Sequence, residues 1–201
     1  MVEVRLYVEG GGDSESLRSQ CREGFRKFLE NAGLAGKMPR IVACGARQAA
    51  YDRFKTAIES NTVALLLIDS EDFFSSASPW EHLWNRPDDR FSRPSSATTT
   101  IAISWLSAWN RGFLRTRRQF KRFFGQGFNA PSLPQGKNIE NISKSDIYTG
   151  LQRATSNCKT KAPYGKGAHS FRLLALVKPS MVFDASPSAN RFREALKKFL
   201  E

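Results

Sequence analysis

Cysteine is scarce in this chain, and its few occurrences suit neither of the structural roles that cysteine usually has. Cys21, Cys44 and Cys158 are far apart and odd in number. Their spacing matches neither a zinc motif nor a disulfide framework, so a reducing cytoplasm is the expected environment.

Long apolar runs are also missing. The longest, residues 63–68, has the length of a strand, whereas a membrane-spanning helix needs about 20 apolar residues. The chain begins Met-Val-Glu-Val-Arg and not with the pattern of a signal peptide. We therefore expect a soluble, cytoplasmic protein without membrane association.

Acidic residues are outnumbered: 31 Lys and Arg face 19 Asp and Glu, which gives a net charge of +12. This balance alone suggests an anionic partner such as nucleic acid. The 201 residues suit one α/β domain with an appendage, or two small domains. We predict an α/β core over residues 1–125 and a mainly helical extension, packed on that core, over residues 126–201.

The first third of the chain alternates between strand and helix patterns. Strands are predicted at residues 2–8, 40–44 and 63–69, and helices at about 14–31 and 47–60. This order predicts βαβ units and a mostly parallel sheet flanked by helices. Residues 70–96, rich in Ser, Pro, Asp and Trp, are predicted as a long surface loop. Further helices are predicted near residues 120–124, 143–154, 168–177 and from 186 onward.

Acidic residues stand where the first and third predicted strands end. Glu9 follows the first strand, and Asp69, Glu71 and Asp72 follow the third. The carboxyl ends of neighbouring parallel strands share one rim, where ligands bind. Clustered carboxylates need a neutralising cation, and Mg²⁺ prefers oxygen ligands, so these four acids are candidate metal ligands for phosphodiester chemistry. Alternatively, Glu9 to Asp13 form only a turn and a helix cap. No Gly-Lys-Ser/Thr follows the glycines, which excludes a Walker loop.

Several phrases carry a family resemblance over nearly the whole chain. They are Tyr7-Val-Glu-Gly-Gly-Gly-Asp13, Arg47-Gln-Ala-Ala-Tyr-Asp52, Gly165-Lys-Gly-Ala-His-Ser-Phe171 and Ser186-Pro-Ser-Ala-Asn-Arg-Phe192. Together they resemble a bacterial family known as domain of unknown function 4276, which is regarded as Toprim-like.

That resemblance implies a Toprim-like fold in which Glu9, Asp69 and Glu71 are the catalytic acids of a Mg²⁺-dependent nuclease subunit. Related small Toprim proteins often act with an ATPase partner in defence against phage. The alternative is a non-catalytic binding or regulatory subunit that keeps the fold and works through such a partner.

One segment departs from the family pattern. Residues 98–118 contain four arginines and no acid, where the family usually carries a Met-Glu-x-Trp-Phe-Leu-x-Asp phrase. When suitable codons are chosen for this segment and the reading frame is started one nucleotide upstream, the shifted frame encodes that phrase in the same order. We interpret Thr98–Arg118 as a compensated double frameshift that leaves the chain inactive; the alternative is a divergent strand and a basic helix. Restoring the shifted reading would lower the net charge to roughly +3 or +4.

The remaining candidates lie in loops. Lys166 and His169 could contact nucleic-acid phosphate, although a histidine at a helix start can equally cap or pack. Trp80, Trp84 and Phe91 could stack on bases or pin their loop to the body of the protein.

Overall fold

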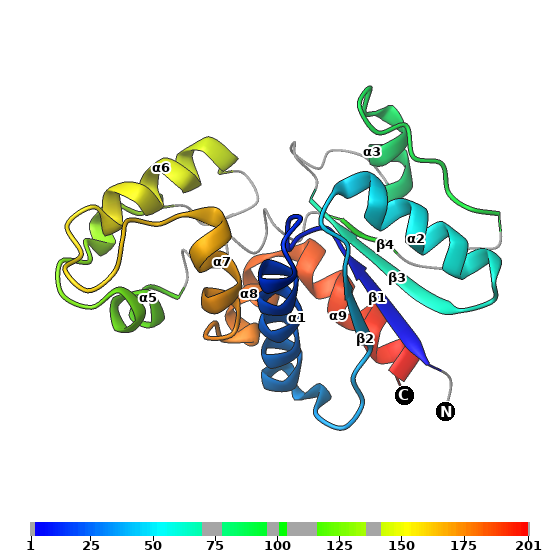
Figure 1. The fold of residues 1–201 in the computed structure, drawn as a ribbon, viewed down its shortest axis with the longest axis horizontal. Coiled ribbons are helices and arrows are strands. Elements are labelled where there is room, and N and C mark those ends of the chain that lie inside the picture. Colours follow the sequence, from blue (N-terminus) through cyan, green and yellow to red (C-terminus); the bar gives the residue numbers. More distant parts are fainter. Residues whose placement is uncertain (1–2, 70–77, 96–100, 104–115, 136–141, 201) are drawn as a thin grey trace.

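The computed structural model describes residues 3–69, 78–95, 101–103, 116–135 and 142–200. In these residues a parallel sheet has the strand order β2-β1-β3-β4. Its strands are β1 (Val4–Val8), β2 (Arg40–Ala43), β3 (Val63–Ile68) and β4 (Ile101–Ile103). Helices flank the sheet, and the C-terminal part is helical (Figure 1). The predicted α/β class with a mostly parallel sheet is confirmed.

Alternate residues of β1 face opposite sides of the sheet. Leu6 and its even-numbered neighbours Val4 and Val8 belong to one core, together with residues of α1 (Glu15–Leu29). Tyr7 belongs to a second core, together with residues of α2 (Arg47–Glu59). The two helices therefore cover opposite faces, as the side-chain alternation of a strand requires.

The helices after β4 extend the first of these cores. They are α5 (Arg117–Phe124), η3 (Ala130–Ser132), α6 (Lys144–Thr155), α7 (Lys166–Leu174), α8 (Pro179–Ala185) and α9 (Pro187–Leu200), and the short η1 (Glu30–Leu34) extends α1. Buried residues of α5, α6, α7 and α9 join the strand residues of that core. In Figure 1, α5 and α6 project away from the sheet, with α7 beside α1. The boundary at residue 125 stays a prediction.

The predicted loop at residues 70–96 is corrected in its second half, where α3 (Pro79–Asn85) forms. Ser78 caps this helix by accepting a hydrogen bond from the Glu81 backbone at 3.1 Å, and Pro79 suits the first turn. A Ser-Pro pair before polar residues was therefore a readable start signal. Residues 70–77 lie outside the described residues.

The aromatic residues of this region divide into two groups. Phe91 is buried and stacks on Tyr51 with ring centroids 4.1 Å apart, and Trp80 packs against Phe54. These two residues pin their segment to the body of the protein, as one of the two interpretations predicted. Trp84 is 58% exposed.

Two short stretches of the anomalous segment, residues 101–103 and 116–118, fall within the described residues. Ile101–Ile103 form β4 beside β3, and Arg117 opens α5, whose Phe120 and Phe124 are buried. Residues 98–100 and 104–115 lie outside the described residues, so the frameshift hypothesis stays a prediction.

The predicted helix at 168–177 instead runs from Lys166 to Leu174, and α8 was not predicted. No helix among the described residues has the length and apolar character needed to cross a membrane.

Candidate metal site at the carboxyl end of the sheet

The rim between β1 and β3 is the point where the chain changes direction across the sheet. From β1 the connection leads to β2 on one side, and from β3 it leads to β4 on the other. In open α/β sheets, ligands bind outside the carboxyl ends of the strands at such a switch point. Glu9 and Asp69 directly follow these two strands, so the sheet places the predicted acids of the first and third strands at one rim.

The turn after Glu9 depends on glycine. Gly11 has φ +88°, and a Cβ at this position would lie 2.8 Å from the Cα of Arg18. Gly10 and Gly45 exchange backbone hydrogen bonds of 2.9 and 2.8 Å, which tie the turn to the end of β2. Ser14 then caps α1 by accepting from Leu17 at 3.2 Å. The predicted turn is thus present, the cap of the helix is Ser14 and not Asp13, and together they fix the backbone beside Glu9.

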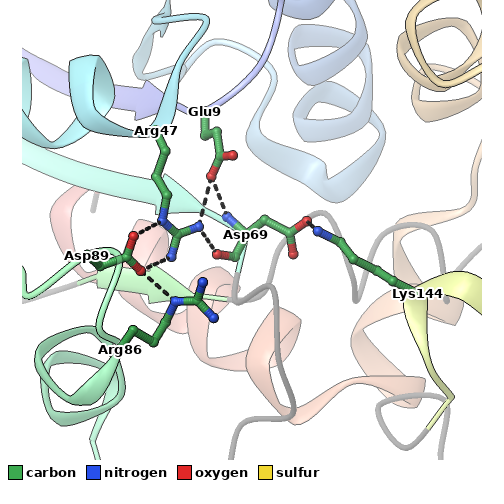
Figure 2. A network of polar contacts seen from close by, with 6 residues as sticks. All are labelled: Glu9, Arg47, Asp69, Arg86, Asp89 and Lys144. Atoms are coloured by element: carbon green, nitrogen blue, oxygen red, sulfur yellow. Dashed lines mark hydrogen bonds and ion pairs between the residues drawn. The ribbon is translucent and has the colours of Figure 1, made fainter.

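The carboxylate of Glu9 is held inside the rim by two donors. Its Oε2 accepts from the Asp69 backbone N–H at 2.9 Å and from Nη1 of Arg47 at 3.3 Å. Arg47 opens α2, and its Nη1 also donates to the backbone carbonyl of Asp69. These bonds join the ends of β1 and β3 to the start of α2 (Figure 2).

Arg47 also binds a second carboxylate. Its Nε and Nη2 donate to Asp89 at 2.7 and 2.6 Å, and Arg86 donates to the same carboxylate at 2.7 Å. The side chain of Asp89 is only 3% exposed. We call Glu9, Arg47, Arg86 and Asp89 the arginine cluster. Its bidentate geometry makes Arg47 a rigid connector, because the planar guanidinium fixes the directions of all its donors.

The carboxylate of Asp69 is more deeply buried than that of Glu9 and has a different kind of partner. The residue is 1% exposed, and neither carboxylate oxygen accepts a hydrogen bond from a described residue. Its charge partner is Lys144, the first residue of α6, which forms an ion pair with Oδ2 by distance but without hydrogen-bond geometry. Figure 2 shows this side chain reaching the rim from the side opposite Arg47.

The donor set at the rim fits a hard cation in part. Buried carboxylate oxygens without hydrogen bonds are suitable ligands for Mg²⁺, and Glu9 offers a second carboxylate at the same rim. Within the described residues, no group of three His, Cys, Asp or Glu side chains gathers as a metal site. Glu71 and Asp72, which were predicted as further ligands, lie outside the described residues.

Comparison with known proteins places this rim in a family. The model of the family described as domain of unknown function (DUF4276) matches residues 8–197. The chain belongs to the DUF4276 family. No curated protein and no solved structure matches it. The DUF4276 match includes both rim acids, the arginine cluster and Lys144.

The two predicted nucleic-acid contacts of this DUF4276 protein lie in α7. His169 is buried, its Nδ1 accepts from the Gly165 backbone at 3.0 Å, and its ring lies 5.4 Å from that of Phe124. Burial, followed by the positive charges of Arg172 and Lys161, lowers its pKa. The histidine therefore packs and caps at the helix start, as the alternative interpretation predicted. Lys166 is exposed, with Nζ 5.9 Å from the ring centroid of Tyr148. Contact of either residue with nucleic acid stays a prediction.

Four residues of the DUF4276 rim were not identified from the sequence: Arg47, Arg86, Asp89 and Lys144. Arg47 and Asp89 contact partners about 40 residues away, and Lys144 belongs to a different part of the chain. Arg47 carries a weak signal, because an arginine that opens a helix just after a strand lies at the ligand-binding rim. Nothing in the sequence pattern around Lys144 indicates Asp69 as its partner.

Proposed function

We propose that this DUF4276 protein is a Mg²⁺-dependent, Toprim-like nuclease subunit that acts with an ATPase partner in phage defence. Asp69 and Glu9 would hold the cation, with Glu71 and Asp72 as further ligands. The observation that carries this proposal is Asp69, a buried carboxylate whose two oxygens accept no hydrogen bond from the described residues. Buried polar groups are otherwise almost always hydrogen-bonded, so such an exception supports a ligand at this position.

In this proposal the bound cation supplies the chemistry, and the residues of the rim hold its ligands in place. A bound Mg²⁺ supplies charge stabilisation at phosphate oxygens and a more acidic water. Arg47 fixes the carboxylate of Glu9, and the Asp69 backbone N–H fixes the same oxygen from the other side. The carboxylate of Glu9 is therefore oriented before any cation arrives, which reduces the reorganisation needed for binding.

The distribution of charge supports nucleic acid as the substrate. Residues 117–174, here called the helical lobe, contain eleven Lys and Arg and two acids, so they contribute +9 of the total +12. Arg118, Lys121, Arg122 and Arg153 are exposed. Without Arg117 and Arg118, which belong to the anomalous segment, nine basic residues remain. Such a localised positive field attracts a phosphate backbone to the side of the rim where Lys144 lies.

Calorimetry with Mg²⁺ and Mn²⁺ tests the proposal on the wild type and on Asp69→Asn. Loss of the carboxylate charge should weaken cation binding at least about tenfold while the fold is kept. Asp52→Asn is the matched control, because Asp52 is an exposed carboxylate on α2. Cleavage of single-stranded DNA, duplex DNA and RNA is then assayed with each cation, in the present chain and in one with the shifted reading of residues 98–118 restored. Equal cation affinity in all three proteins would refute the metal site.

A non-catalytic binding or regulatory subunit is the second candidate. The observation that favours it is that Glu9 and Asp69 already have cationic partners in Arg47 and Lys144. This candidate predicts neither cation binding nor cleavage in either version of the chain, together with a stable complex with an ATPase encoded beside it. Metal-dependent cleavage by the purified chain would exclude it.

A further inference from the structure

Lys144 occupies the position at which a metal ion would compensate the charge of Asp69. We infer that Lys144 is a built-in counter-cation, and that a divalent cation binds at the rim only by displacing the Lys144 ammonium from Asp69. This inference rests on the proposed metal site. It adds a regulatory step: cation occupancy decides where a lysine of the helical lobe lies.

The first argument is the burial of Asp69. At 1% exposure its charge has almost no contact with water, and an ionised carboxylate in such a place requires a partner of opposite charge. Lys144 is the described cation that supplies it. In the absence of metal, the lysine is therefore the group that compensates this buried carboxylate.

The second argument is the difference between the two cations at the rim. Arg47 is bound through a fork of directed hydrogen bonds to Asp89 and Glu9, so moving it would break several bonds at once. Lys144 meets Asp69 through one ion pair, from a single ammonium group to Oδ2. A lysine is a point charge on a flexible stem, which suits a contact that has to be released.

The third argument is that Lys144 can move without unfolding its helix. The side chain is 19% exposed, so solvent is within its reach. The helix behind it is anchored independently: Ser143 caps it by accepting from Asp146 at 3.1 Å, and Ile147 and Leu151 are buried in the core. A change of rotamer at residue 144 therefore leaves α6 in place.

The two cations exclude each other because both would contact the same carboxylate, where like charges repel at short range. Binding linkage then works in both directions: a metal ion weakens the Lys144 contact by the same factor by which Lys144 weakens metal binding. The released ammonium joins the positive field of the helical lobe, on the side where an anionic substrate is expected.

Calorimetric titration with Mn²⁺ tests the competition in the wild type, Lys144→Met and Lys159→Met. Removing the competitor should tighten Mn²⁺ binding roughly 5- to 150-fold in Lys144→Met, whereas Lys159→Met, which removes an exposed lysine of the same lobe, should leave it unchanged. Equal affinity in the wild type and Lys144→Met, or weaker affinity in the variant, would overturn the inference and leave the metal site standing. Absence of Mn²⁺ binding in all three proteins would overturn the proposed metal site, and the inference with it.

A second measurement uses the wild-type protein and so does not depend on how the variant folds. Lysine acetylation, read by mass spectrometry, should be slow at Lys144 without metal and faster at saturating Mn²⁺. Lys121 and Lys166 are exposed internal standards whose rates should not change. An unchanged rate at Lys144 under saturating Mn²⁺ would show that the ammonium is not displaced, and would overturn the inference.

Discussion

The two acids at the rim are neutralised in different ways. Glu9 belongs to the arginine cluster, which lies in the sheet part of the chain and uses directed hydrogen bonds between side chains of low exposure. Asp69 is more deeply buried, yet its oxygens accept no hydrogen bond from the described residues, and its partner Lys144 comes from the helical lobe. The contacts of the cluster are those of a scaffold, whereas the Asp69–Lys144 pair is the contact that we propose a cation exchanges.

This difference between Glu9 and Asp69 indicates a separate role for each acid, which their positions in the sheet alone do not. Both carboxylates end a strand at the switch point, so position alone would give them equal roles. The pattern of donors separates them: Oε2 of Glu9 accepts two directed hydrogen bonds, which suits a carboxylate that orients other groups, whereas Asp69 is contacted at Oδ2 by the Lys144 ammonium, a group that a cation could replace. We therefore expect Asp69 to dominate cation affinity and Glu9 to dominate the geometry of the rim.

The largest effect is expected from removing the centre of the arginine cluster. Arg47→Met leaves the low-exposure carboxylates of Glu9 and Asp89 without their shared partner and should lower the free energy of unfolding by about 3–5 kcal/mol. Urea unfolding measures it, with Arg40→Met as control, because Arg40 is 66% exposed and its ion-pair partner, Glu3, is exposed as well. A loss no greater than that of the control would show that the cluster is not scaffold.

The next largest effect is expected where α1, which covers the sheet, packs against α7 of the helical lobe; we call this contact the seam. A Cβ on Gly24 of α1 would lie 2.6 Å from the backbone oxygen of Phe171 in α7, so Gly24→Ala must push the two helices apart. We expect a loss of roughly 1–3 kcal/mol in the free energy of unfolding. The control is Gly167→Ala, at a helical position with no atom within 4 Å, which should gain up to about 1 kcal/mol. Equal gains in both variants would mean that the seam is not tightly packed.

A smaller effect is expected from correcting the anomalous segment, residues 98–118, which runs into the start of the helical lobe. If residues 98–118 are out of frame, restoring the shifted reading should raise the melting temperature by about 2–4 °C for each kcal/mol regained and lower the pI from about 10.0. Differential scanning calorimetry and isoelectric focusing measure both quantities. A restored variant that melts below the present chain, or a gene read that confirms the present codons, would favour the divergent strand and basic helix.

The smallest effect lies in the interior of the lobe. Burial lowers the pKa of His169, so the folded state binds a proton less readily than the unfolded chain. Stability is then complete above the unfolded pKa and falls as the pH drops below it. Urea unfolding at about pH 7.5 and 5.5 should show a larger loss for the wild type than for His169→Asn, which keeps an acceptor for the Gly165 N–H. Equal losses would place the titrating group elsewhere.

The sequence predicted those parts of the rim that depend on local pattern. Glu9 and Asp69 were found because strand alternation locates the strand ends, and parallel pairing brings those ends together. Arg47, Asp89 and Lys144 were missed because their partners are set by tertiary packing, which spacing along the chain does not encode. Helix α3 was missed because its Ser, Pro and Trp content was interpreted as a loop, although Ser78 and Pro79 form a start signal.

The origin of Lys144 in the lobe has a consequence for synthesis of the protein. Asp69 is made 75 residues before Lys144. At about 5–20 residues per second, this interval lasts about 4–15 s. During that time the nascent sheet has its acid but not the lysine that compensates it. The newly made rim must therefore remain hydrated, or accept a free cation from solution, until the C-terminal helices emerge from the ribosome and dock.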